Sequence, residues 1–186
     1  MLTMYEPMTN CLQYINDGRS VRTVRMLFLT KELLYDAANY AYIDGDGISE
    51  DDVHGRHRVM DITDDGNRDR VVRVLDLAHA ACVEMLYPYT KTELPDDMEQ
   101  MDNTTEEKEA YAITLRLPDG ISKSTLELLS KNVHEYLVCR VVADWMSLTH
   151  PESTATWTDK ADHAAYSVKT CLHTRMGRTL RRMSVF

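Results

Sequence analysis

The sequence predicts a mainly α-helical fold: a helical bundle around one long central helix at about 124–148, with a small β element and extended terminal arms. Two observations support this prediction. Apolar residues recur every three or four positions along the central segment, as they do on the buried face of a helix. Two short segments, about 23–28 and about 111–117, instead alternate apolar and polar residues, which is typical of strands.

The central segment is apolar around much of its circumference. Its main face consists of Leu126, Leu129, Val133, Leu137, Val141, Trp145 and Leu148, and Leu128, Val138, Cys139 and Val142 widen it. A helix of this kind is normally buried by neighbours on several sides. We therefore expect the rest of the chain to pack around it, along about 37 Å at 1.5 Å per residue.

A second helix is predicted over 153–175. Its narrower apolar stripe contains Trp157, Ala161, Ala164, Val168, Leu172 and Met176. Pro151 stands just before it, where the missing backbone N–H is not needed. Because the hinge at Thr149-His150-Pro151 is short, we expect the two helices to be antiparallel neighbours.

The N-terminal part predicts an arm over 1–20 and then a single helical domain over 21–178. The strand at 23–28 leads into a helix from Thr30 to about Tyr42, with Thr30 as its N-cap. Leu33, Leu34, Ala37, Ala38 and Ala41 form its packing face. Its three tyrosines, Tyr35, Tyr40 and Tyr42, are expected at the margins of that face, and such residues are common on contact surfaces as well as in cores.

Alternating aspartates at Asp44-Gly45-Asp46-Gly47 suggest a calcium loop, but Val53 stands where such a loop needs its last carboxylate. We therefore expect a solvated turn. Ser49 is the predicted cap of a short helix that ends near Ile62. That helix places His54 and His57 on one face with Asp61 a turn further on, the weak candidates for a metal site. No third ligand is fixed by the sequence, so we expect no metal.

A helix over about 68–86 precedes an acidic loop at 92–109. The loop has few apolar residues to bury, so we expect it to be mobile when the protein is alone. The strand at 111–117 follows. Because a strand needs a partner, we expect it to pair with 23–28 or with the same strand of another subunit.

Composition limits the possible functions. The 186 residues are 44% hydrophobic, which suffices for one packed domain. The net charge of −9 repels nucleic acid and anionic membrane at long range. We expect no export signal and no membrane span. The four cysteines, Cys11, Cys82, Cys139 and Cys171, are widely spaced, which favours reduced, buried thiols and a cytosolic site of synthesis.

Catalytic motifs are absent from the sequence. It has no glycine-rich phosphate loop, no nucleophile elbow and no paired-cysteine zinc spacing. His79 with Cys82, or His134 with Cys139, would be a thiol–imidazole pair only if the thiol were exposed and activated. The patterns place these cysteines in packing faces, so we expect no enzyme and no cofactor. Trp145 and Trp157 are expected in packing.

The C-terminal tail, 179–186, is basic and apolar. From Lys160 to Phe186 six basic residues stand against the single acid Asp162, a net charge of +5 that leaves −14 for the rest of the chain. The tail arginines can contact phosphate or an acidic patch on a neighbouring copy, and the acidic body favours the second interpretation. The candidate interface residues are Arg175, Arg178, Arg181, Arg182, Val185, Phe186, Glu106 and Glu107.

Several stretches together resemble small virion structural proteins of tailed bacteriophages that infect gut bacteria. These are Leu86-Tyr87-Pro88-Tyr89-Thr90-Lys91, then Glu135-Tyr136-Leu137-Val138-Cys139-Arg140-Val141-Val142-Ala143-Asp144-Trp145, then Pro151 and Trp157, and the Arg-Arg-Met-Ser-Val-Phe end. The likeness spans 30–186 and is greatest to the head–tail connector or neck adaptor class.

The resemblance implies a non-enzymatic, mostly helical subunit of a homo-oligomeric ring in the virion neck, between portal and tail proteins and near DNA in a channel. The resemblance also implies assembly in the host cytoplasm and the exchange of arms or tails between neighbouring subunits. A tail terminator or another neck ring protein would look much the same. No residue role is transferred by it.

Two other functions remain as alternatives. The first is a DNA-binding accessory or regulatory protein that uses the C-terminal arginines. The second is a metal-dependent enzyme at His54, His57 and Asp61.

Overall fold

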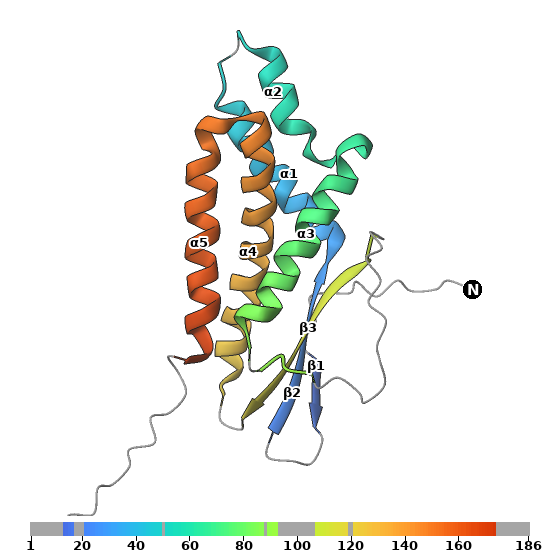
Figure 1. Ribbon diagram of the computed structural model, residues 1–186, viewed down its shortest axis with the longest axis vertical. Helices are drawn as coiled ribbons and strands as arrows, with labels where there is room; N and C mark the ends of the chain where they lie inside the picture. Colours follow the sequence, from blue (N-terminus) through green and yellow to red (C-terminus); the bar gives the residue numbers. More distant parts are fainter. Residues whose placement is uncertain are drawn as a thin grey trace, which may run out of the picture.

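The computed structural model describes residues 13–16, 21–49, 51–87, 89–92, 107–118 and 121–173. The helices are α1 (Thr30–Asp46), α2 (Val53–Met60), α3 (Asp65–Met85), α4 (Lys123–Thr149) and α5 (Pro151–His173), with a 3-10 turn η1 (Asp61–Thr63), and the strands are β1 (Gln13–Asn16), β2 (Val21–Leu29) and β3 (Ala110–Pro118) (Figure 1). The prediction of a mainly helical bundle with a small β element is confirmed.

Helix α4 is the centre of the fold. It begins after Ser122, whose hydroxyl oxygen accepts a hydrogen bond from the backbone N–H of Thr125 at 3.2 Å. Its buried residues include Leu129, Val133 and Leu137, each with no exposed surface. Helices α1, α3 and α5 pack against it. The predicted face was too wide at two positions, since Leu128 and Leu148 are 43% and 46% exposed.

Helix α5 runs back along α4, as the short hinge predicted (Figure 1). Pro151 is its first residue, and the backbone N–H of His150 closes the end of α4 on the carbonyl of Met146 at 2.8 Å. The predicted stripe is buried at Trp157, Ala161, Ala164, Val168 and Leu172. Met176 lies outside the described residues.

The described sheet has the order β1-β2-β3, and both pairings are antiparallel. Val24 lies opposite Leu115, and Phe28 lies opposite Tyr111. All four of these side chains are buried, because this face of the sheet packs under the helices. The predicted pairing of 23–28 with 111–117 is therefore confirmed. Strand β1 lies within the segment predicted only as an arm.

Helix α1 continues four residues beyond its predicted end and reaches Asp46. The prediction of a solvated turn that begins at Asp44 is therefore wrong for Asp44, Gly45 and Asp46. Tertiary contacts explain the extension. Gly45 is buried, and a Cβ added to it would lie 3.1 Å from Met60 Cγ. Thr30 is not the N-cap, which is Leu29. As the first helical residue, Thr30 instead donates its hydroxyl to the carbonyl of Lys108.

Helix α2 and η1 form a corner at one end of α1 and α4. The cap of α2 is Asp52 rather than the predicted Ser49, and its carboxylate accepts from Gly55 N–H at 2.9 Å. Val59 and Ile62 are fully buried. Trp145 of α4 donates its indole N–H to the carbonyl of Val59 at 2.8 Å, which fixes the corner to the central helix.

Candidate functional site

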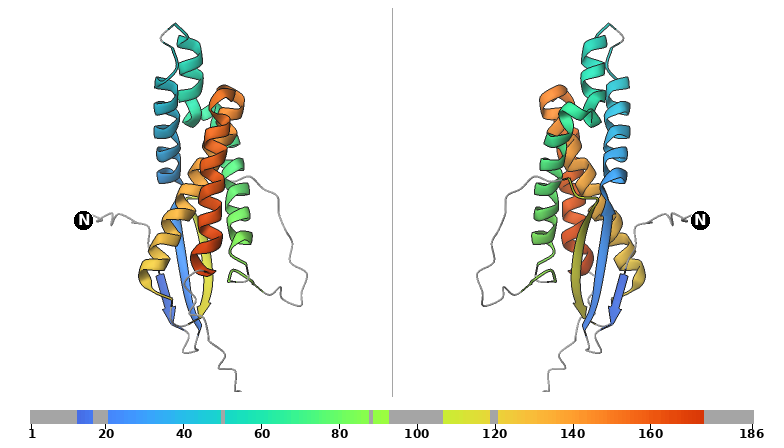
Figure 2. Two further views of the ribbon diagram at one scale, coloured as in Figure 1. Left: turned by 90° about the vertical axis from the view of Figure 1, so that its left-hand side faces the viewer. Right: turned by 90° about the vertical axis from the view of Figure 1, so that its right-hand side faces the viewer.

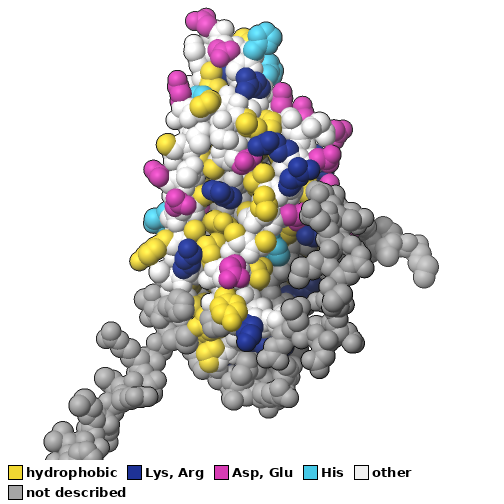
Figure 3. Space-filling model, viewed as in Figure 1, with side chains coloured by type: hydrophobic (Ala, Val, Ile, Leu, Met, Phe, Trp, Pro, Cys, Tyr) yellow, Lys and Arg dark blue, Asp and Glu magenta, His cyan; other side chains and the backbone are white. Residues whose placement is uncertain are grey.

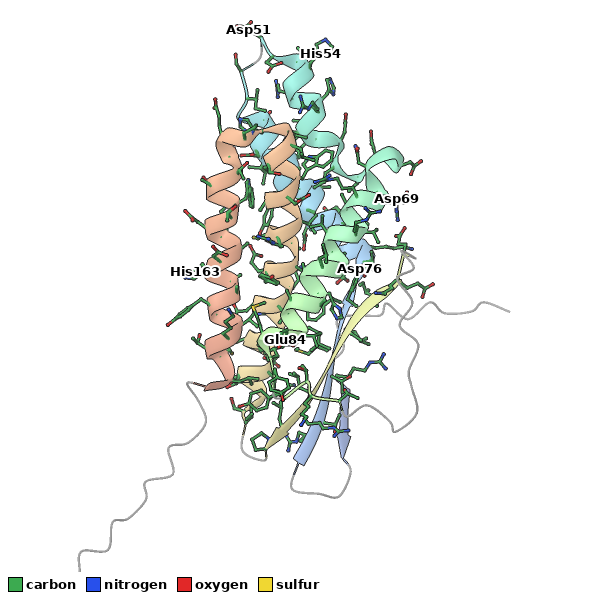
Figure 4. All side chains as sticks on the ribbon, in the orientation of Figure 1. Asp51, His54, Asp69, Asp76, Glu84 and His163 are labelled. Atoms are coloured by element: carbon green, nitrogen blue, oxygen red, sulfur yellow. The ribbon has the colours of Figure 1, made fainter. Side chains whose placement is uncertain are left out.

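The metal candidates do not form a site. His54 and His57 are exposed on α2, and Figure 4 shows His54 near the outer end of that helix. Asp61 belongs to η1, where its backbone carbonyl accepts from the Asn67 side chain at 2.8 Å. Among the residues that the structure describes, no three His, Cys, Asp or Glu side chains are placed to hold a metal ion.

The thiol–imidazole pairs are not nucleophilic pairs. Burial raises the pKa of Cys82 to about 12, and His79 points to β3, where its Nε2 lies 3.0 Å from the carbonyl oxygen of Ala112. Burial, with the charge of Glu135 in second place, raises the pKa of Cys139 to about 12. His134 instead contacts Asp36 at 2.8 Å. Both thiols are therefore held protonated at neutral pH.

A serine, a histidine and an aspartate meet at the hinge between α4 and α5. Ser153 Oγ donates to Asp44 Oδ1 at 3.0 Å and lies 2.9 Å from His150 Nδ1, and the same nitrogen is 3.4 Å from Asp44 Oδ2. A catalytic triad needs the two imidazole nitrogens to face serine and aspartate separately. Here both partners share Nδ1, so the cluster ties the hinge to the end of α1.

A polar and aromatic network joins α1, α4 and α5. Tyr40 donates its hydroxyl to Glu135 at 3.0 Å, and its ring packs on Trp157 with centroids 5.1 Å apart. Lys160 Nζ lies 3.8 Å from the centroid of the Trp157 ring. Burial, followed by the neighbouring Glu135 carboxylate, raises the pKa of Tyr40 to about 12. The network is structural, and Trp157 packs in the core as predicted.

The more informative features are on the surface. A trough of about 730 Å³ runs over α4 between α3 and α5. Hydrophobic side chains gather along the middle of this face, with basic side chains among them (Figure 3). The lining includes Val74, Leu77, Ala78, Ala81 and Met85 of α3, Tyr136, Arg140, Ala143 and Asp144 of α4, and Asp162, Ala165 and Lys169 of α5. Small residues leave the trough open.

Helix α1 presents a ridge of three exposed apolar side chains: Tyr35 at 67%, Tyr42 at 59% and Ile43 at 67% exposure. Tyr35 and Tyr42 point the same way, because positions seven residues apart return to one side of a helix, and Ile43 lies about 80° around the helix from Tyr35. Beside this ridge a second groove, of about 840 Å³, separates α1 from α4. Large exposed apolar side chains grouped in this way mark contact surfaces.

The ridge and the trough lie on opposite sides of the molecule. Figure 2 shows α1 and α3 on either side of the α4–α5 pair. The sequence indicates the ridge through the three tyrosines of α1, although only Tyr35 and Tyr42 of these are exposed. No local pattern predicted the trough, since its walls are helices that meet only in the folded chain.

The predicted interface residues are mostly outside the described ranges. Arg175, Arg178, Arg181, Arg182, Val185, Phe186 and Glu106 are among those not described. Glu107 is described and is paired within the chain, since its two carboxylate oxygens accept from Arg68 at 2.7 and 2.8 Å. These hydrogen bonds lower the pKa of Glu107. An arginine from another copy would have to compete with Arg68 for this carboxylate.

Comparison with known proteins gives no relative: no family model, no curated protein and no solved structure matches the chain. No helix in the described ranges is long and apolar enough to cross a membrane.

Proposed function

We propose that this chain is a non-enzymatic structural subunit of a tailed bacteriophage virion, of the head–tail connector or neck adaptor type. The observation that supports an assembly function is the pair of apolar surfaces on opposite sides of α4, the α1 ridge and the trough. A subunit with two distinct, opposed contact surfaces binds one neighbour on each side, as the members of a ring do.

The contacts of the candidate catalytic side chains support the same proposal. Three of the candidate catalytic groups have a structural partner: His79 with β3, Cys139 with Glu135, and the hinge histidine with α1. The sequence resemblance contributes the virion context, with portal and tail proteins as further partners. A tail terminator ring would use the same kinds of surface, so it remains within the proposal.

The test is the native mass of the purified chain by light scattering over a concentration and salt series, with negative-stain images of the same samples. We expect a discrete oligomer with ring-shaped particles. We also expect a chain without 179–186 to remain folded and to lose assembly, because the tail supplies basic and apolar contacts. Normal assembly of the shortened chain would reject the function proposed for the tail.

A further inference from the structure

The trough has the dimensions of a helix-binding groove. Its α5 wall extends from Thr154 to Lys169, about 22 Å at 1.5 Å per residue. Its floor on α4 contains Ala143 and Ser147 beside the larger Tyr136 and Arg140, and its α3 wall contains Ala78 and Ala81. A groove whose small residues leave room between larger ones can accept the apolar face of an amphipathic helix.

Helix α1 fits that description. It has 17 residues, or about 25 Å of helix, so it matches the trough in length. Its outer side is unusual for a surface helix, since Tyr35, Tyr42 and Ile43 are all more than half exposed. Lys31, Asn39 and Asp46 are exposed on the same side, and helix geometry places Asn39 between Tyr35 and Ile43.

The two surfaces carry opposite net charge. In the trough, Asp144 is neutralised by Arg70 at 2.9 Å, which leaves Arg140 and Lys169 against Asp162. The groove beside the ridge is lined by four carboxylates and two lysines: Glu32, Asp36, Glu127 and Glu135 with Lys31 and Lys131. Glu127 is paired with Lys123 at 3.7 Å, which leaves an excess of one carboxylate. Approach of the ridge side to the trough side therefore brings a groove with one excess negative charge to a trough with one excess positive charge.

We propose that the α1 ridge of one copy docks in the trough of a second copy. This inference rests on the proposed assembly function and specifies its contact. Because ridge and trough are different surfaces on opposite sides, each bound copy keeps one of each free. The contact is therefore heterologous, and it closes into a ring or grows into a filament. One contact thereby covers both of the exposed apolar surfaces.

The test uses one variant of each surface. Tyr42→Asp places a charge in the ridge, and Ala81→Arg fills the trough; both positions are exposed in the subunit, so folding should be unaffected. Each variant alone should weaken self-association by at least roughly tenfold, the loss expected for a central interface residue. An equimolar mixture should form a dimer and nothing larger, because one intact ridge meets one intact trough.

Matched controls keep the result specific. Ala80→Arg makes the same change one residue away, turned about 100° from Ala81 around α3. Tyr166→Asp changes a tyrosine that is 67% exposed but does not line the trough. Both controls should assemble as the wild type does. If Ala81→Arg loses its circular dichroism spectrum, Leu77→Asp at the trough rim takes its place.

The outcomes separate this inference from the proposed function. A mixture that stays monomeric while the wild type forms rings overturns the ridge-to-trough contact and leaves the function standing. A wild-type monomer at every concentration also overturns the contact, and leaves the function only as assembly on another virion protein.

Discussion

Helix α4 and the corner formed by α2 and η1 are held in the fold by different forces. Thirteen residues of α4 are buried, against two residues of the corner, Val59 and Ile62. The corner depends instead on specific links, among them the Trp145 indole to Val59 and the Arg56–Asp46 pair. Truncating an apolar side chain of α4 should therefore destabilise the whole molecule, whereas loss of a link should release only one part of it.

The largest effect is expected from Leu137→Ala. Leu137 has no exposed surface and lies in the middle of α4, so its truncation should lower the free energy of unfolding by about 2–5 kcal/mol. Leu148→Ala, on the same helix but 46% exposed, is the control and should cost less than about 1 kcal/mol. Urea denaturation measures both. Equal losses would mean that α4 is not the apolar centre.

A smaller effect is expected from Trp145→Phe. The change removes the donor to the carbonyl of Val59 and leaves that oxygen buried without its partner, a cost of about 1–3 kcal/mol. Hydrogen exchange should accelerate in α2 and η1 before it does in α5. Unchanged protection of α2 would show that apolar contacts alone hold the corner.

A polar link outside the corner is testable through pH. Burial, followed by the charge of Lys108, lowers the pKa of His79, although the hydrogen bond to Ala112 and the carboxylate of Asp76 oppose this. The unfolded chain binds a proton near the ordinary value of 6.5, where the folded protein does not. Stability is therefore complete above that pH and falls as the pH drops from it towards the lowered folded value.

His79→Gln keeps an N–H donor for the carbonyl of Ala112 and removes the titration. Its melting temperature should depend less on pH between 7.5 and 5.5 than that of the wild type. Above pH 7 the two proteins should differ little. Equal pH dependence in both would assign the acid sensitivity to another group.

The smallest effect is expected from Asp46→Asn. Arg56 and Asp46 are 2.6 Å apart, but the Asp46 side chain is 62% exposed, so water and salt screen the pair. The change should cost no more than about 0.5 kcal/mol and should have no effect in high salt. Chemical denaturation at two salt concentrations measures it. A loss as large as that of Trp145→Phe would mean that surface charge holds the corner.

The sequence was most informative where local pattern and burial coincide. The apolar residues of α4 and α5 and the alternation in β2 and β3 follow one period each, so their types and partners were predictable. Helix α1 ran on through Asp44 and Gly45 because Met60 and His150, distant in sequence, contact that turn. Strand β1 has only four residues, too few to show a period.

The candidate surfaces were less predictable than the fold. The tyrosines of α1 can be seen in the sequence, and only packing decides that Tyr40 turns inward while Tyr42 stays exposed. The trough depends on how far apart α4 holds α3 and α5. The apolar periodicity of a single helix does not predict how far apart two neighbouring helices lie.

No loop separates β2 from α1, so strand and helix form one continuous rod. At the junction Thr30 is clamped to the start of β3, with its N–H 3.0 Å from the carbonyl of Glu109. The start of α1 is thus held by the sheet, and its far end is held by the hinge, where Asp44 contacts Ser153 and His150. The placement of Tyr42 and Ile43 on the surface is therefore fixed from two directions, by the sheet and by the hinge.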